Sequence, residues 1–93
     1  MDARPTIPYV NLPELPPGHV LSHEWRTYRG ELPRLLEEGN EGKFALIKGD
    51  EILGLYDSWD RARAEGLRRF LLEPHMVKQI LSQEPLLRLR GVA

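Results

Sequence analysis

Four carboxylates lie close together in the stretch FALIKGDEILGLYDSWD, residues 44–60. Converging carboxylates can hold a metal ion or act as general acid and base. Asp50 and Glu51, however, occupy the tip of a predicted β-hairpin, and Asp57 follows its second strand. Seven residues of strand span roughly 20 Å, so Asp50 and Asp57 are too far apart to share one ion. Asp57 and Asp60 are better explained as first-turn residues of a helix, where the helix dipole favours them.

Two histidines, His19 and His23, are four residues apart, a spacing that would place two imidazoles on one helical face and could supply zinc ligands. Ser22 is the predicted start of that helix, however, so His19 precedes it. A third ligand would have to come from His75 or Glu24, and nothing in the sequence requires either. We therefore expect no metal site.

Other reactive groups and phosphate-binding loops are also not predicted. The sequence has no cysteine, which excludes disulfides, thiolate metal sites and a thiol nucleophile. It contains no GxGxxG loop, and the Gly-Lys pair of EGKF is followed by an aromatic residue and a strand instead of a helix. The sequence thus predicts a protein that is not an enzyme and holds no cofactor.

Arginines provide the candidate partner-binding residues: Arg61, Arg63, Arg68, Arg69, Arg88 and Arg90. The first four belong to a predicted helix, and the last two alternate along a predicted C-terminal strand. A basic helix beside a basic strand could contact the phosphates of a nucleic acid. Asp60 and Glu65 interrupt the basic helix, however, and the pI is near 6.3.

The chain of 93 residues is long enough for one domain. Hydrophobic residues make up 41% of it, too many for a disordered chain. Its longest apolar runs fall far short of the ~20 residues that span a bilayer, and MDARPTIPYV lacks the features of a signal peptide. We therefore expect a cytoplasmic protein without membrane association.

The formal net charge of −1 is unevenly distributed along the chain. Residues 1–60 contain six Lys/Arg and eleven Asp/Glu, a net of −5, while residues 61–93 contain seven and three, a net of +4. Such a split suits a protein partner or self-association. The simpler expectation is that these charges mix in space once the chain folds.

An N-terminal segment, residues 1–21, is rich in proline. Because proline lacks a backbone N–H and fixes φ, we expect neither a helix nor an inner strand here. The segment should run extended as a strap over the domain. The following helix is predicted to be capped by Ser22 and to end at Gly39. Its apolar face comprises Trp25, Tyr28, Leu32, Leu35 and Leu36, and Pro33 predicts a kink or break.

A β-hairpin is predicted for KFALIK and EILGLYD, joined by a type II′ turn at Gly49-Asp50. That register places Leu46 opposite Leu53 and Phe44 opposite Leu55. One face then carries Phe44, Leu46, Leu53 and Leu55, and the other carries Ala45, Ile47, Ile52 and Tyr56. Since both faces are apolar, something must cover each of them.

A second helix follows, capped by Asp57 or Ser58 and ended by Pro74. Its predicted buried stripe comprises Trp59, Ala62, Gly66, Leu67, Phe70 and Leu71. Arg63 falls inside this stripe, so either its stem packs while its head reaches water, or it pairs with a carboxylate or a ligand. HMVKQIL and LLRLR are predicted strands connected by SQEP. The expected class is α+β, with the order strap-α-β-β-α-β and a possible last β, folded as one domain over residues 22–93.

The segment EGKFALIKGDEILGLYDSWDRARAEG resembles a family of short uncharacterised prokaryotic proteins. That family shares a Gly-Lys-aromatic strand, a Lys-Gly-Asp-Glu turn, a second strand and an Asp-Ser/Thr-capped helix. The resemblance covers residues 41–70 best, and WRTYRGELPRLLEEG and RRFLLEPHMV are similar to its longer, planctomycete-like members. It implies a compact module around the hairpin and carries no activity. Where Arg63 stands, the family usually has an apolar residue.

These observations predict a small non-catalytic protein-interaction or accessory module that binds a protein partner or a second copy of itself. The alternative is a nucleic-acid-associated, antitoxin-like regulator that uses the basic second helix and the C-terminal strand.

Overall fold

Two helices and two small antiparallel sheets make up residues 5–16 and 18–85, the part of the chain that the computed structural model describes. The order is β1 (Thr6–Pro8), a 3-10 turn η1 (Tyr9–Asn11), α1 (Ser22–Glu37), β2 (Phe44–Lys48), β3 (Glu51–Tyr56), α2 (Trp59–Phe70), β4 (Met76–Gln79) and β5 (Gln83–Pro85). The predicted α+β class is confirmed. Neither helix within these residues is long and apolar enough to cross a membrane.

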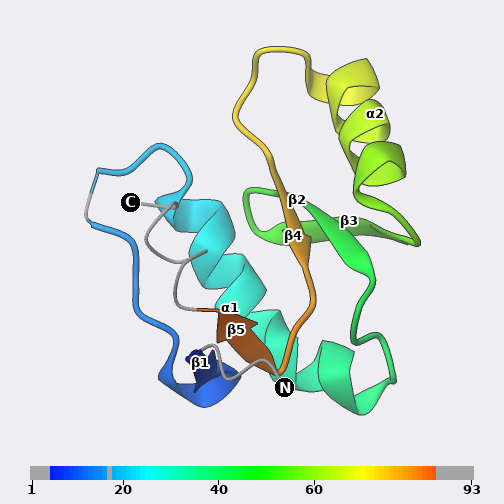
Figure 1. Ribbon diagram of the computed structural model, residues 1–93. Coiled ribbons are helices and arrows are strands. Elements are labelled where there is room, and N and C mark those ends of the chain that lie inside the picture. The colour runs from blue at the N-terminus through cyan, green and yellow to red at the C-terminus, as the bar shows by residue number, and fades with distance from the viewer. Residues whose placement is uncertain (1–4, 17, 86–93) are drawn as a thin grey trace.

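The central sheet has the order β3-β2-β4, and the two helices cover its opposite faces (Figure 1). Ala45 and Ile47 of β2 point toward α1, whereas Leu46 points toward Gly66 of α2. Most of the core lies on the α1 side: Leu12, Trp25, Tyr28, Leu32, Leu35, Ala45, Ile47, Met76 and Ile80. The α2 side is much thinner, with Leu46 and Ala62 as its fully buried side chains in the described part of the chain.

Helix α1 differs from its prediction at its start and in its middle. Ser22 is its first residue and Leu21 is its N-cap, without a side-chain cap. The helix runs through Pro33 without a break, because the residues around it bury a strong apolar face that outweighs the lost hydrogen bond. Its predicted end is confirmed: Gly39 has φ +81°, and the Asn40 N–H donates to the Leu35 carbonyl at 3.0 Å, as in a Schellman motif.

The hairpin forms as predicted at its turn but not along its whole length. Gly49 has φ +58° while Asp50 has no positive φ, as a type II′ turn requires. The register then shifts at a bulge, so that Leu46 pairs with Gly54 instead of Leu53. The extra residue exchanges the two sides of β3 beyond it.

This shift corrects two predicted positions. Leu55 lies on the α1 side, packed against the core, and Tyr56 pairs with Phe44 on the other face. A Cβ added to Gly54 would lie 2.8 Å from Tyr56 Oη. A larger residue there would require the Tyr56 ring to move, because that ring folds back over the strand.

The proline-rich strap also needs two corrections. Its residues are not extended throughout, since a 3-10 turn follows β1. SQEP is not merely a connection, because β5 within it pairs with β1 in antiparallel register. Prolines fit this ribbon because each of its strands has a free edge, where no N–H is required. The strap does cover the core: Leu12 is buried, and the indole N–H of Trp25 donates to the Pro13 carbonyl at 2.7 Å. The predicted strand LLRLR lies outside the described residues.

Candidate protein-interaction surface

Small residues bring α2 close to the sheet. Ala62 and Gly66 are its buried residues. A Cβ added to Gly66 would lie 2.7 Å from Cδ2 of His75 and 3.1 Å from Cδ1 of Leu46, so only glycine allows this approach without displacement. Ser58 caps the helix as predicted, since its hydroxyl accepts a hydrogen bond from a backbone N–H of the first turn.

The buried apolar stripe predicted for α2 is wrong for three of its large side chains, whereas a fourth, Phe70, is half-buried. Trp59 is 45% exposed, Leu67 39% and Leu71 72%. Because Ala62 and Gly66 form the contact with the sheet, only a narrow strip of the helix is covered. The bulky side chains beside that strip extend into solvent.

Two neighbouring rows of residues, each at a spacing of four, form the exposed side of α2 and of the turn after it. One row comprises Trp59, Arg63, Leu67 and Leu71, and the other comprises Asp60, Ala64, Arg68 and Leu72; all eight are exposed. We call these eight residues the α2 surface. Leu72 is 98% exposed. Four large apolar side chains are thus exposed on one side of the helix and the turn after it, and exposed apolar surface can mark a site of interaction.

Arg63 stacks on the indole ring of Trp59, with Cζ 5.1 Å from the ring centroid. This geometry is a cation–π contact. Arg63 is exposed and therefore does not pack into the predicted buried stripe. Within the described part of the chain, Arg61 and Arg63 form no ion pair with any acidic group.

Arg68 and Arg69 share one carboxylate, that of Glu65. Arg68 donates through Nε at 3.1 Å and also through Nη2, and Arg69 donates through Nε at 2.7 Å. The hydrogen bonds from Arg68 and then from Arg69 lower the pKa of Glu65, and Glu65 in turn raises the pKa of Arg68. Two guanidiniums against one carboxylate leave this end of α2 with a net positive charge.

The structure therefore brings part of the predicted arginine set together. Arg61, Arg63, Arg68 and Arg69 all lie on α2 and are exposed. Arg69 is not part of the α2 surface and lies in the neighbouring row with Arg61 and Glu65. Arg88 and Arg90 lie outside the described residues.

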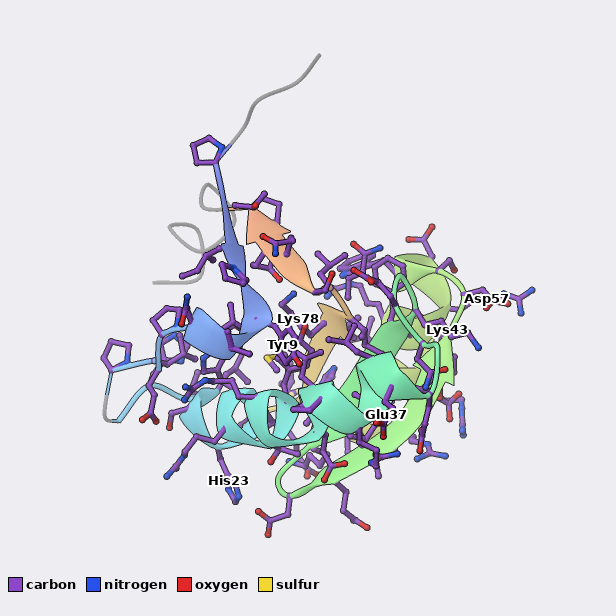
Figure 2. All side chains as sticks on the ribbon, turned by 90° about the horizontal axis from the view of Figure 1, so that it is seen from below. Tyr9, His23, Glu37, Lys43, Asp57 and Lys78 are labelled. Carbon is purple, nitrogen blue, oxygen red and sulfur yellow. The ribbon has the colours of Figure 1, made fainter. Side chains whose placement is uncertain are left out.

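The predicted carboxylates do not converge. Asp50 at the hairpin tip contacts His23 Nε2, while Asp57 lies at the far end of the molecule in Figure 2. In the parts of the chain that the structure describes, no three His, Asp or Glu side chains are grouped so that they could hold a metal ion.

The hairpin turn is instead tied to the first turns of α1. Glu24, 5% exposed, accepts a hydrogen bond from the Gly49 N–H at 2.7 Å. The Thr27 hydroxyl donates to the Gly49 carbonyl at 2.6 Å. A buried carboxylate with a backbone donor at this distance is a structural contact, so the turn and the helix position each other.

The three histidines each have a separate local role. Nδ1 of His19 accepts from the Leu21 N–H at 3.1 Å just before α1. His75 packs on Phe70, with ring centroids 5.5 Å apart, at the end of α2. His23 contacts Asp50.

Replacing Asp50 with asparagine is expected to cost on the order of 0.5 kcal/mol of stability, as for an exposed surface position. The His23 and Asp50 side chains are both largely exposed, so solvent screens their attraction. Urea unfolding followed by circular dichroism measures the change. A loss as large as that of a core substitution would show that the turn does more than close the hairpin.

A buried polar network is the feature that sequence reasoning missed. Lys78 Nζ donates to Glu84 Oε1 at 2.6 Å, and their side chains are 12% and 2% exposed. The same ammonium lies 5.0 Å from the centroid of the Tyr28 ring, and the Tyr28 hydroxyl donates to the Gln79 carbonyl at 3.1 Å. In the view of Figure 2, Lys78 lies between the strap and α1. The only sequence signal was a lysine at a core-facing position of a strand.

Comparisons with protein-family models, with curated proteins and with solved structures find no match to this chain.

Proposed function

We propose that this protein is an interaction module that works by binding a protein through the α2 surface, without chemistry of its own. The observation that carries this proposal is the exposed pair of Trp59 and Arg63, stacked on each other beside Leu67. Tryptophan and arginine are the residue types most enriched among those that dominate binding energy at protein interfaces. Leu71 and Leu72 extend the apolar area beyond the end of the helix.

The backbone after α2 supports the same proposal. Leu71 has φ +51° and ψ −106°, a backbone conformation that residues other than glycine rarely adopt. This conformation ends the helix, and Leu71 and the following Leu72 are both left in solvent. Residues held in such conformations cluster at functional sites.

The charges of the α2 surface favour a protein over a nucleic acid. A phosphate backbone is bound by a stripe of free cations. Here Asp60 lies within the surface itself, beside Arg63 and Arg68, so the surface is not uniformly basic. Exposed leucines contribute nothing to phosphate contacts, whereas burying them against another protein is favourable.

Photo-crosslinking tests this proposal. With a benzophenone amino acid at Ala64, in the middle of the α2 surface, irradiation of the protein in cells is expected to give a covalent adduct with a protein. The matched control places the same amino acid at Val20, which is 67% exposed and lies before α1. It should give no such adduct.

Two outcomes would contradict the proposal. Equal yields from Ala64 and Val20 would mean that the α2 surface binds nothing specifically. An adduct with a nucleic acid at Ala64 would favour the regulator alternative.

A further inference from the structure

We infer that the protein bound by the α2 surface is a second copy of this chain, with the two α2 helices antiparallel about a two-fold axis that passes near Ala64. This inference rests on the proposed function and adds the identity of the partner.

The first argument is the order of charges in one row of the surface. Asp60, Ala64 and Arg68 follow one another at a spacing of four, with a small residue between opposite charges. A two-fold interface must be complementary to itself. When two such rows run antiparallel with Ala64 at the axis, Asp60 of each copy faces Arg68 of the other.

Both charges are available for this contact. Asp60 forms no ion pair within the described residues. Arg68 is 68% exposed and shares Glu65 with Arg69. A guanidinium has five N–H donors, so it can bind a second carboxylate as well.

The neighbouring row supplies the apolar contact. In the same antiparallel arrangement, Trp59 at the start of α2 faces Leu71 and Leu72 at the end of the second copy. Arg63 and Leu67 then meet near the axis, where the aliphatic stem of the arginine can cover the leucine. The small side chain of Ala64 lets the two helices approach closely.

The distribution of charge along α2 favours a second copy over a different protein. Within the α2 surface, the first turn of the helix carries Asp60 and the last turn carries Arg68. An acidic partner would match the arginines but would be repelled by Asp60. An antiparallel copy matches both ends at once, and the two helix dipoles also oppose each other favourably.

A charge exchange tests this arrangement by analytical ultracentrifugation. The wild-type protein is expected to dimerise in a concentration-dependent manner. Asp60→Arg puts two like charges in contact at both symmetric positions, and so does Arg68→Glu. Each variant alone is therefore expected to dimerise at least tenfold more weakly. An equimolar mixture of the two variants restores both opposite-charge contacts, so a mixed dimer of near wild-type affinity should form.

Two control variants change the same kinds of charge outside the α2 surface. Asp57→Arg alters the acidic start of the helix, and Arg69→Glu removes the other arginine that binds Glu65. Both are expected to dimerise like the wild type. Circular dichroism of every variant verifies that it folds. A variant with a folding defect would not regain dimerisation on mixing, so recovery of the dimer in the mixture supports the charge contacts.

A wild-type protein that stays monomeric at millimolar concentration would overturn the inference. So would a wild-type dimer whose two charge variants fail to recover on mixing. If the chain is monomeric while position 64 still crosslinks to another protein, the partner is not a second copy, but the proposed interaction function is supported. If Ala64 gives no specific adduct, the function itself fails.

Discussion

Glu84→Gln is expected to lower the free energy of unfolding by about 3–5 kcal/mol, the usual result of breaking a buried ion pair on one side. The carboxylate of Glu84 is almost completely buried and accepts from Lys78 Nζ at 2.6 Å. The substitution keeps the shape of the side chain but takes its negative charge away from the ammonium group. The low-polarity interior between the strap and α1 then has to accommodate that positive charge.

Urea unfolding of the single and double variants measures this effect. Replacing both partners, as in Lys78→Met with Glu84→Leu, is expected to cost less than Glu84→Gln alone, because no charge then remains to be buried. Glu38→Gln, at an exposed pair with Arg34 in α1, is the matched control and should change stability far less. Equal losses at Glu84 and Glu38 would show that the pair is hydrated in solution.

Leu46→Ala is expected to destabilise the protein by about 2–5 kcal/mol, the range for a fully buried leucine. Leu46 is inaccessible to solvent and lies between β2 and Gly66 of α2. Because this side of the sheet has few other buried side chains, the neighbouring elements offer little that could fill the resulting cavity.

Leu53→Ala is the informative comparison. In an unshifted register Leu53 would face Leu46 and both truncations would cost alike. In the structure Leu53 is the extra residue of the bulge and is only half-buried, so its truncation should cost clearly less. Thermal or urea unfolding of the two variants side by side measures the difference, and equal losses would contradict the bulge.

Much of the fold could be predicted from local signals. The Gly-Asp turn, the capping Ser58 and the C-terminal Gly39 each act through the conformation of a few neighbouring residues, and all three are confirmed. The bulge at Leu53 could not be predicted, because both candidate registers bury apolar residues and only the packing of Tyr56 over Gly54 separates them. Strand β5 could not be predicted either, because its partner β1 lies at the other end of the chain.

The charged residues of the candidate site could be predicted from the sequence, but the exposure of its apolar residues could not. The arginines of α2 follow from the sequence. A helical stripe of Trp59, Leu67 and Leu71 looks like a core face, however, and only the close approach at Gly66 shows that these residues lie beside the covered strip. The ion pair of Lys78 and Glu84 depends on the same kind of tertiary placement.

The ribbon of β1 and β5 has a consequence for the order in which the molecule folds and opens. The Thr6 hydroxyl donates to Gln83, a contact across 77 positions of the chain. Closing so long a loop costs more entropy than forming the hairpin or either helix, and the ribbon has three residue pairs where the hairpin has five. The ribbon should therefore assemble last and separate first, in brief excursions that leave the central sheet intact. Each opening of the ribbon would expose Leu12 and the ion pair of Lys78 and Glu84 to water. The stability of the ribbon therefore determines how often water reaches this part of the interior.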